Sequence, residues 1–398
     1  MGQAKPHVVV AGGSLGGLTA ALTLRDAGCD VTVIERSRTA LIGLGAGIVL
    51  NPATVRYLTQ QPDFDLSAIS IATQCVRYMD DDGGVLHQRP CRYRFSSYNA
   101  LYQALLQRLD AHQYHLNTTL SSLEQNENGV IAQLADGRTL RCDLLVCADG
   151  IRSTARGVLC PGLVPSYAGY VAFRGTVKRD EIGAATFAQL SDAITYRILP
   201  QSHLLTYPIP FADPASGMTE TQMNWLWYCN VPPGEPLDVL MTDRDGTRRD
   251  LSLPPGMMQP AHVVALRADA ERLPPPLREV VQATAKPFVQ VIVDLEMPRM
   301  VFGKVCLIGD AGFVARPHAA AGTAKAAEDA WTLAAAMRAT DGDVSRALQA
   351  WEPPQLALGR AVLARTREAG RRSQVAGDWQ VGDLLPFGLH AVGDSEMA

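Results

Sequence analysis

The sequence predicts an α/β protein in which a Rossmann-like domain with a parallel sheet carries an inserted domain built on an antiparallel sheet. Three separated segments each combine a continuous apolar strand with a turn of small residues, and two of them continue into a helix. Alternation of buried strands and helices is typical of a parallel sheet covered on both faces. The chain between residues 166 and 285 instead combines alternating aromatic residues with repeated prolines, a pattern that favours antiparallel strands.

The first of these segments covers residues 7–35. His7–Ala11 is an apolar run that predicts a buried strand, and Leu15–Ala27 has the apolar spacing of a helix. Val31–Ile34 predicts a second strand. Strand, glycine turn, helix and strand in this order are the context that a dinucleotide-binding turn requires.

The turn itself, from Gly12 to Gly17, is a variant of the G-x-G-x-x-G fingerprint with Ser14 in place of the middle glycine. Gly12 allows the tight turn, and Gly17 allows the helix and the strand to approach closely. Ser14 is small enough to admit a pyrophosphate, which the free N–H groups at the helix start would bind. Glu35, at the end of the second strand, suits the hydroxyls of a ribose. A glycine-rich turn without any ligand is the alternative for this motif alone.

The other two segments also end in turns that carry an aspartate. Leu144–Cys147 predicts a buried strand that leads to Asp149-Gly150, and Val305–Ile308 predicts one that leads to Gly309-Asp310. A helix is expected from about Gly322 onward. Each turn alone is compatible with an ordinary Asp-Gly or Gly-Asp turn. Three such turns in this order indicate a single nucleotide-binding fold.

The rest of the chain predicts a hairpin and a helical C-terminal segment. Phe211–Gly217 is expected as the loop of a hairpin in the inserted sheet. From Val344 to about Arg372 the pattern is helical apart from Pro353-Pro354, and the last twenty or so residues are expected to be loose. The predicted division of the chain is a discontinuous nucleotide-binding domain (1–74, 95–165 and 286–343), a substrate-binding domain (75–94 and 166–285) and a C-terminal helical segment and tail (344–398).

Composition and charge exclude several classes of protein. The 398 residues carry a net charge of −4, which provides no basic surface for nucleic acid. The eight cysteines form no C-x-x-C pair and no cluster with histidine, so no metal site is predicted and free thiols in a reducing compartment are expected. No run approaches the roughly 18 apolar residues of a membrane span, and the first residues do not resemble a signal peptide. The sequence therefore predicts a soluble, cytoplasmic protein without a nucleic-acid or membrane partner.

Together the three turns resemble the motifs of the single-component flavoprotein aromatic hydroxylases, the p-hydroxybenzoate hydroxylase family. The resemblance covers most of the chain. In this family the fingerprint is followed by D-G-x-x-S-x-x-R and then by a motif that begins G-D-A. The matching residues here are Asp149, Gly150, Ser153 and Arg156 for the second motif, and Gly309, Asp310, Ala311, Pro317, Gly322, Glu328, Asp329 and Ala330 for the third.

The resemblance implies FAD as the cofactor, NADH or NADPH as the co-substrate, and hydroxylation of a small aromatic ring with O₂ through a flavin C4a-hydroperoxide. Within the family, the likeness is to members that hydroxylate 2,6-dihydroxypyridine at C3. These share two departures from the wider pattern: Ser14, and Tyr98 where most members carry an FAD-contacting arginine. A phenolic or hydroxybenzoate-type substrate is the alternative with the same chemistry, and a non-catalytic FAD-binding scaffold is a more distant one. The family also implies a homodimer.

Candidate site residues follow from the same resemblance. Asp310 would accept hydrogen bonds from the ribityl hydroxyls of FAD, Leu120 would meet the adenine through its backbone, and the small residues after Pro317 would approach the flavin ring at a helix N-terminus. The expected catalytic residues are Tyr207, His318, Tyr170 and Arg174. The expected cofactor-binding residues are Gly12, Ser14, Leu15, Gly17, Glu35, Arg36, Val49, Leu120, Asp149, Gly150, Asp310, Pro317, Ala319, Ala320, Ala321, Gly322 and Thr323.

The substrate-side candidates also have structural interpretations. Tyr207 on a strand is compatible with a core residue whose hydroxyl is satisfied, and Arg174 with a brace between the domains. His203 is a further candidate for proton handling. The alternating pair Trp225 and Trp227 predicts two tryptophans on one strand face, in the core or in a pocket wall.

Two other enzyme classes share part of this pattern. A flavin-dependent halogenase would carry W-x-W-x-I-P, whereas here Trp225-Leu226-Trp227 is followed by Tyr228-Cys229-Asn230. A plain NAD-dependent dehydrogenase would explain the first glycine turn but would leave Asp149 and Asp310 without a role. Both classes therefore explain less of the chain than a flavoprotein hydroxylase does.

Overall fold

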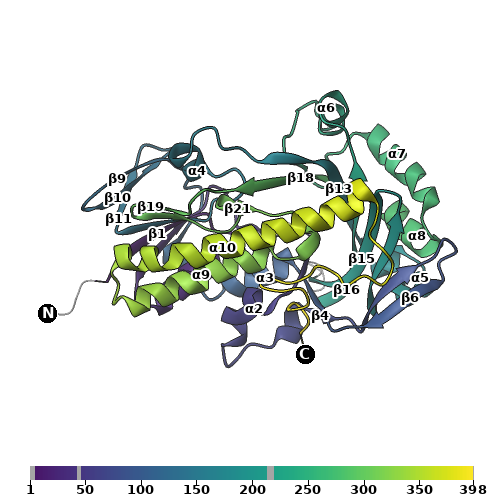
Figure 1. The fold of residues 1–398 in the computed structure, drawn as a ribbon, viewed down its shortest axis with the longest axis horizontal. Coiled ribbons are helices and arrows are strands. Elements are labelled where there is room, and N and C mark those ends of the chain that lie inside the picture. Colours follow the sequence, from purple (N-terminus) through teal and green to yellow (C-terminus); the bar gives the residue numbers. More distant parts are fainter. Residues whose placement is uncertain (1–4, 43–45, 213–218, 398) are drawn as a thin grey trace.

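The computed structural model describes residues 5–42, 46–212 and 219–397, and these confirm the predicted α/β fold with a parallel and an antiparallel sheet (Figure 1). The Rossmann-like sheet has six strands in the order β19-β20-β12-β1-β2-β8 and is parallel except at the β19–β20 pair. The central strand is apolar throughout because it is buried on both faces. The strands are β1 (His7–Ala11), β2 (Asp30–Ile34), β8 (Tyr114–His115), β12 (Leu144–Cys147), β19 (Val301–Phe302) and β20 (Val305–Leu307).

Helices cover one face of this sheet. On that face α1 packs against α9, and the long helix α10 runs alongside α9 (Figure 1). The α-helices of the chain are α1 (Leu15–Asp26), α2 (Pro52–Thr59), α3 (Tyr98–Leu106), α4 (Thr154–Leu159), α5 (Ala184–Leu190), α6 (Glu235–Leu240), α7 (Pro260–Asp269), α8 (Pro275–Ala283), α9 (Gly322–Ala339) and α10 (Val344–Gly370). Short 3₁₀ turns occur at Leu66–Ile69, Ala111–Gln113, Arg179–Glu181, Ala270–Arg272, Gly309–Ala311 and Pro317–Ala319, and a π-helical turn at Arg371–Ala376 follows α10.

Two small antiparallel sheets complete the nucleotide side of the molecule. The first, in the order β11-β10-β9, shares a hydrophobic core with β1 and β12 on the face opposite the helices. Its strands are β9 (Leu120–Asn126), β10 (Gly129–Leu134) and β11 (Thr139–Cys142). The second, in the order β3-β7-β4, consists of β3 (Gly47–Val49), β4 (Ile71–Ala72) and β7 (Arg94–Ser97).

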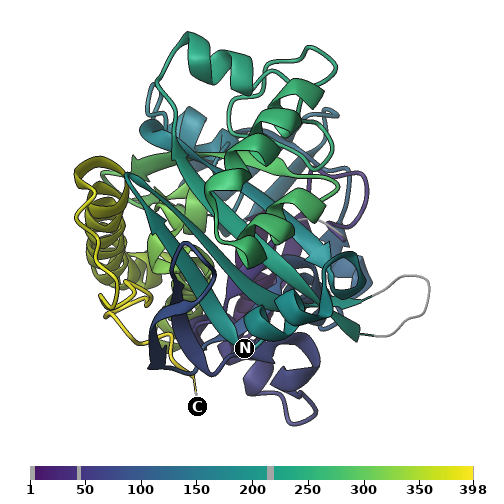
Figure 2. The same cartoon turned by 90° about the vertical axis from the view of Figure 1, so that its right-hand side faces the viewer.

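The largest sheet has the strand order β17-β18-β13-β16-β15-β14-β5-β6, with β21 paired to β18. Its described pairs are antiparallel except for β14 with β5. Helices α7 and α8 lie over its outer face (Figure 2). The strands are β5 (Cys75–Met79), β6 (Val85–Pro90), β13 (Ser166–Lys178), β14 (Ala193–Leu199), β15 (Ser202–Ala212), β16 (Thr219–Asn230), β17 (Ser252–Leu253), β18 (Phe288–Glu296) and β21 (Phe313–Val314).

Alternation along β16 gives this sheet two different faces. Trp225 and Trp227 share the outer face, as predicted, and both are fully buried there. The indole of Trp225 donates to the hydroxyl of Thr284, 2.8 Å away, just beyond α8. Tyr228 and Leu226 belong to the opposite face, where they join a separate hydrophobic cluster. That inner face is the one that meets the nucleotide side of the molecule.

The predicted hairpin in the inserted sheet is confirmed as the antiparallel pair β15–β16, in register from His203 opposite Tyr228 to Ala212 opposite Thr219. Most of the loop expected at Phe211–Gly217 lies outside the described residues. The division into domains remains a prediction. Strand β18, on the nucleotide side of the predicted boundary between residues 285 and 286, is hydrogen-bonded in the large sheet to β13 and β17.

The C-terminal helix does not break at its two prolines, contrary to the prediction. Helix α10 continues through Pro353 and Pro354, each of which removes a backbone donor. Tertiary contacts on both sides of the pair hold the helix together. Trp351 and Gln355 are buried, and the carboxylate of Glu352 accepts two backbone N–H bonds, of 2.7 and 2.8 Å, at the start of β19.

The expectation of a loose C-terminal tail is also wrong. Residues 378–397 lack regular secondary structure, yet Leu385, Phe387 and Leu389 are buried. Asp394 accepts backbone N–H bonds from three successive residues beginning at Leu389, at 2.7 to 3.1 Å. Arg365 of α10 donates to the carbonyl of Leu389 at 2.9 Å. The apolar side chains of this segment provide the burial that a loose tail lacks.

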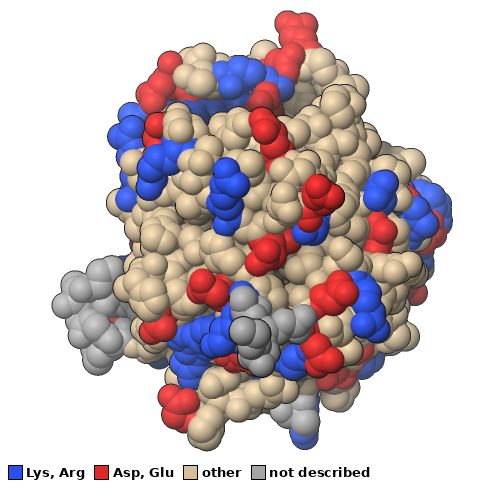
Figure 3. Space-filling model, turned by 90° about the vertical axis from the view of Figure 1, so that its left-hand side faces the viewer, with Lys and Arg blue, Asp and Glu red and all other residues tan. Residues whose placement is uncertain are grey.

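The surface provides no large field of one sign on the face drawn in Figure 3, where acidic and basic side chains are intermixed. Among the described residues, no helix is long and apolar enough to cross a membrane. All eight cysteines are free thiols, as expected, and six of them are buried.

The packing of the tail predicts that replacing the side chain of Leu389 by alanine destabilises the protein. Because Leu389 is fully buried, Leu389→Ala should lower the free energy of unfolding by about 2–4 kcal/mol. The control Val381→Ala, at a position 40% exposed in the same segment, should change it by less than about 0.5 kcal/mol. Urea denaturation measures both, and equal values for the two variants would contradict the packed tail.

Candidate active site

The three predicted turns meet at one edge of the Rossmann-like sheet. Strands β1, β12 and β20 are parallel neighbours, so their carboxyl ends lie side by side. Gly12 follows β1, Asp149 follows β12 and Asp310 follows β20. In open α/β sheets, ligands bind in the crevice outside these carboxyl ends. The fold therefore brings together three motifs that are far apart in the sequence.

Gly12 and Gly17 make the close approach that the fingerprint predicts. The φ angle of Gly12 is +104°, and a Cβ at this position would lie 2.3 Å from the carbonyl oxygen of Ala148. At Gly17 a Cβ would lie 1.8 Å from the carbonyl oxygen of Gly12. Neither position accepts a side chain, because the atoms in the way belong to the backbone.

Ser14 and Tyr98, the two departures from the family pattern, contact each other. Their hydroxyls are 2.7 Å apart. Ser14 is the N-cap residue of α1, but its side chain makes no capping bond. Tyr114 donates to the carbonyl of Gly13 at 3.0 Å, and a hydroxyl–hydroxyl bond of 3.1 Å joins Tyr114 to Tyr102. A group of tyrosines therefore supports the glycine turn from below.

Glu35 is tied to the same turn. One oxygen of its carboxylate accepts the N–H of Gly13 and the other accepts the N–H of Ser37, both at 2.8 Å. A carboxylate has further lone pairs, so these bonds leave acceptor capacity for a ribose. Leu15 is buried in the first turn of α1, whereas Arg36 is exposed beyond β2. Leu120 is the buried first residue of the edge strand β9.

The second and third motifs are joined by Arg156. Its guanidinium donates to the backbone carbonyls of Asp310 and Ala311, at 3.2 and 3.0 Å. Asp149 accepts the N–H of Ala155 through Oδ2, but its other oxygen, Oδ1, is buried without a partner. Burial raises the pKa of Asp149, opposed mainly by a hydrogen bond from Ser153.

Asp310 points into open space at the centre of this edge. More than a third of the residue is accessible from the cavity, while the protein walls around it restrict hydration and raise the pKa of its carboxyl to about 6. The nearby charge of Arg156 acts in the opposite direction. The turn before it is fixed by Asp329 of α9, whose carboxylate accepts the N–H of Gly309 at 3.0 Å and pairs with Lys325.

A cavity of about 520 Å³ extends from this edge to the inner face of the large sheet. It brings together eight of the predicted cofactor residues and three of the predicted catalytic residues. These are Val49, Asp310, Pro317, Ala320, Ala321, Gly322 and Thr323 with Tyr207, His318 and Arg174 in the lining itself, and Ala319 buried directly behind it. The residues of the glycine turn, Glu35, Arg36, Leu120, Asp149 and Gly150 do not line it.

His318 is the most tightly connected of the predicted catalytic residues. Its Nε2 lies 2.7 Å from the hydroxyl of Tyr170, which reaches the site from behind rather than lining it. Arg316 lies over the ring of Tyr170, 5.7 Å from its centroid, and is held by Asp294 in an ion pair of 2.7 Å. Burial, assisted by the charge of Arg316, lowers the pKa of His318 to about 3. The imidazole is therefore neutral at pH 7.

Tyr207 and Arg174 occupy the other end of the cavity. Tyr207 stacks on Phe95 with ring centroids 4.2 Å apart, and burial raises the pKa of its phenol to about 12. Arg174 donates to Gln290 at 2.6 Å and lies over the ring of Phe288. Its Nε is buried without a partner. Both residues therefore combine a packing contact with an open side toward the cavity.

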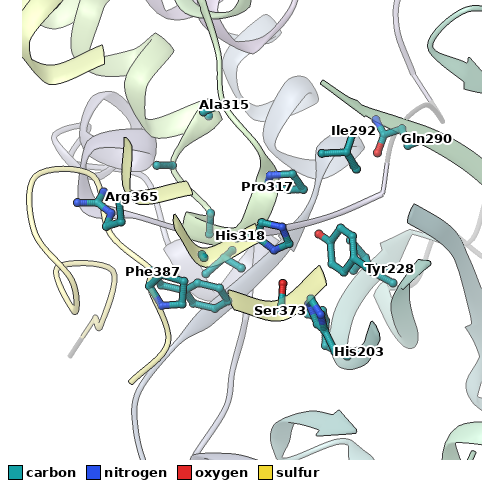
Figure 4. Close-up of a pocket in the computed structure, with 18 of the residues that line it drawn as sticks. His203, Tyr228, Gln290, Ile292, Ala315, Pro317, His318, Arg365, Ser373 and Phe387 are labelled. Atoms are coloured by element: carbon teal, nitrogen blue, oxygen red, sulfur yellow. The ribbon is translucent and has the colours of Figure 1, made fainter. Parts of the chain in front are cut away.

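His203, the further candidate for proton handling, also lines the cavity, together with several residues that the sequence did not indicate. Tyr228 and His203 come from β16 and β15, and their rings converge on His318 (Figure 4). Ser373 enters from the π-helical turn after α10 (Figure 4). Trp379 and Phe387 come from the tail that was expected to be loose. The apolar content of that tail was the one signal in the sequence that could have indicated them.

Described residues contain no group of three or more histidine, cysteine, aspartate or glutamate side chains that could hold a metal ion. The polar groups of the site are instead neutral rings, hydroxyls and separate charged side chains such as Asp310 and Arg174. Such a lining is suited to an organic ligand with a planar ring.

Comparison with known proteins gives matches along the whole chain. Residues 5–162 match the family described as FAD binding domain, and residues 167–294 match FAD binding domain-like. The chain is 38% identical over 394 residues to 2,6-dihydroxypyridine 3-monooxygenase of Paenarthrobacter nicotinovorans, covering 98% of each sequence. It is 27% identical to the 3-amino-4-hydroxybenzoate 2-monooxygenase PtmB3 of Streptomyces platensis, covering 92% of this chain and 88% of that one. Among solved structures, 2,6-dihydroxypyridine-3-hydroxylase from Arthrobacter nicotinovorans superposes with a TM-score of 0.91 over 98% of both chains, at 38% identity.

The close approach at Gly12 predicts an unusually large effect of one methyl group. Gly12→Ala should lower the free energy of unfolding by at least about 3 kcal/mol. The added Cβ would clash with the backbone of Ala148, and the positive φ at this position is unfavourable for alanine. The control Gly28→Ala has a similar φ of +96° but no atom within 4 Å, so it should cost only about 1–2 kcal/mol. Equal losses in urea denaturation would show that φ alone, and not the close approach, fixes this glycine.

Proposed function

Because the chain belongs to the family of FAD-dependent aromatic-ring monooxygenases, we propose that it hydroxylates 2,6-dihydroxypyridine at C3. The enzyme uses FAD as its cofactor and NAD(P)H as its co-substrate. The observation that carries the proposed substrate is the 38% identity to a 2,6-dihydroxypyridine 3-monooxygenase over 98% of both chains. A phenolic or hydroxybenzoate-type ring is the alternative, which the 27% identity to a monooxygenase of an aminohydroxybenzoate supports more weakly.

The residues at the sheet edge fit FAD. The unpartnered Oδ1 of Asp149 and the carboxylate of Asp310 provide acceptors for hydroxyl groups. A Cβ added at Gly150 or at Gly322 would have no atom within 4 Å, so space for a ligand remains beside both glycines. We assign the pyrophosphate to the turn from Gly12 to Gly17 and the start of α1, where backbone N–H groups are available.

When bound at this edge, FAD would supply the redox chemistry, which is hydride acceptance from the nicotinamide and activation of O₂. The start of α9 contributes its free N–H groups and the positive end of the helix dipole, which favour negative charge on the reduced flavin. The aromatic walls of the cavity exclude water from the reacting centre. We assign orientation of the substrate ring to Tyr207 and His318, with Tyr170 holding His318 from behind.

Arg174 is assigned a supporting role in the same cavity. It already bonds to Gln290, and its charge lowers the pKa values of Tyr207 and Tyr228 against the larger effect of burial. A cation at this end favours a substrate that binds as an anion.

We place the reaction in the cytoplasm, where NAD(P)H and free thiols coexist, and expect a homodimer from the family resemblance.

The proposed reaction predicts substrate-stimulated oxidation of the nicotinamide. Purified enzyme with FAD should oxidise NADH or NADPH faster when 2,6-dihydroxypyridine is present, and mass spectrometry should detect a product one oxygen atom heavier. Parallel reactions with 4-hydroxybenzoate test the alternative ring class. Flavin reduction without any product from 2,6-dihydroxypyridine would reject the proposed substrate while leaving the family assignment intact.

The pKa of Asp310 predicts how FAD binding depends on pH. A carboxylate accepts hydroxyl hydrogen bonds better than a carboxylic acid does, so FAD should bind less tightly as the pH falls through about 6. Asp310→Asn should bind FAD more weakly at pH 7.5 and lose this pH dependence. Fluorescence titration of the FAD-free protein with FAD at pH 5.5 and 7.5 measures both effects.

Asp136→Asn provides the matched control, because Asp136 is an exposed turn residue that bonds to Arg138. This variant should keep the pH profile of the wild type. The assignment of Asp310 to FAD would be rejected if Asp310→Asn also kept that profile.

A further inference from the structure

Two histidines from different elements face each other across the cavity, and their tautomers are set by different partners. The ring centroids of His203 and His318 are 5.7 Å apart, and both rings pack against Tyr228. His203 lies on the inner face of the large sheet, and His318 lies in the loop before α9 (Figure 4). A neutral imidazole carries one N–H, so its bonding partners decide which nitrogen can act as a donor.

His203 is neutral and is fixed by one side chain. Burial, reinforced by the neighbouring His318, lowers the pKa of His203 well below its usual range. Its Nδ1 lies 3.1 Å from the amide nitrogen of Gln374, which is itself buried. The amide group can only donate through this nitrogen, so Nδ1 is the acceptor and the proton of the ring is on Nε2.

The opposite orientation of the amide is less favourable. The carbonyl oxygen Oε1 of Gln374 is buried without a partner. Exchanging the two ends of the amide would leave an NH₂ group, with two donors, in that same environment. Buried N–H groups without partners are rarer than carbonyl oxygens without partners. The backbone of Gln374 is also fixed, because its carbonyl accepts the amide of Asn230 at 2.8 Å.

His318 is arranged in a corresponding way. A phenol is a stronger proton donor than a neutral imidazole N–H, so the hydroxyl of Tyr170 donates to Nε2 of His318, 2.7 Å away. The proton of His318 is then on Nδ1. Among the described residues, neither Nε2 of His203 nor Nδ1 of His318 has a hydrogen-bond partner, and both rings line the cavity.

We propose that His203, held by Gln374 as the Nε2–H tautomer, is a specificity-determining donor that binds an oxygen atom of the substrate ring. This proposal deepens the proposed function and rests on it. Because both histidines are donors, the cavity selects a ring that presents acceptor oxygens. A hydroxylated pyridine in its oxo or deprotonated form is such a ring, whereas a ring with a single hydroxyl satisfies one donor and leaves the other unpaired. Gln374 acts through His203 and is a positioning residue.

Two substitutions of His203, by glutamine and by asparagine, distinguish the loss of the donor from the loss of side-chain volume. Glutamine places its amide nitrogen near the position of Nε2, and asparagine places it near that of Nδ1. His203→Asn should weaken the binding of 2,6-dihydroxypyridine by roughly tenfold, the equivalent of one hydrogen bond. It should also lower the yield of product per NAD(P)H oxidised. His203→Gln should stay within about threefold of the wild type in both measurements. Perturbation of the flavin spectrum gives the dissociation constant.

Gln374→Glu tests the positioning residue with His203 left in place. A carboxylate only accepts hydrogen bonds, so it favours the neutral tautomer in which the single ring proton has moved from Nε2 to Nδ1 and Nε2 is an acceptor. This variant should therefore reproduce the weakened binding of His203→Asn and its lower yield of product per NAD(P)H oxidised. Wild-type affinity in both His203→Asn and Gln374→Glu would overturn the proposal.

The tautomer itself is measurable without any substrate. In holoenzyme labelled with ¹⁵N-histidine, the signals that disappear in His203→Gln should show a protonated Nε2 and an unprotonated Nδ1. The reverse pattern would overturn the proposal even if His203→Asn or Gln374→Glu fails to fold. If the wild type does not hydroxylate 2,6-dihydroxypyridine, the proposed function fails, and this spectrum still decides the assignment of the donor.

Discussion

The site depends on the backbone contact between the glycine turn and the strand ends beside it. Gly17 leaves no room for a side chain against Gly12, and Gly12 leaves none against Ala148. This contact seats the start of α1 at the carboxyl ends of β1 and β12, and the next strand, β20, brings Asp310 to the same edge. A displaced α1 would move α9, which packs along it and carries the other helix N-terminus of the site.

The opposite side of the cavity is built on a different principle. There the alternation of a β-sheet places Tyr228 toward the cavity and Trp227 away from it. The histidines are neutral because they are buried, whereas Arg174 brings to the cavity a cation whose hydrogen-bond partner, Gln290, is uncharged. The cavity therefore combines directional donors with one cation, which suits recognition of a ring by the positions of its oxygens.

Local sequence patterns were sufficient for the parts of the protein whose structure is local. The predicted strand His7–Ala11 and the predicted helix after it match β1 and α1, because the apolar pattern of a buried strand or helix is carried by residues close together in the sequence. The contact of His203 with Gln374 joins residues 171 positions apart, and no periodicity reports it. The predicted helix break at Pro353 and the predicted loose tail around Phe387 were wrong for the same reason. Tertiary burial overrides the structure that the local residues favour.

The two sides of the cavity should therefore respond differently to mutation. On the nucleotide side, backbone atoms fix the geometry, so the tolerance for added atoms at Gly12 is small. The tail has no regular backbone ladder and is located by side chains: Asp394 binds three N–H groups of the tail and accepts a further bond from Asn51, the N-cap of α2. Side-chain anchors can be exchanged without rebuilding the sheet. Substitutions in the tail, at Trp379 or Phe387, should therefore change the preference for a substrate ring with the least disturbance of the fold around the cavity.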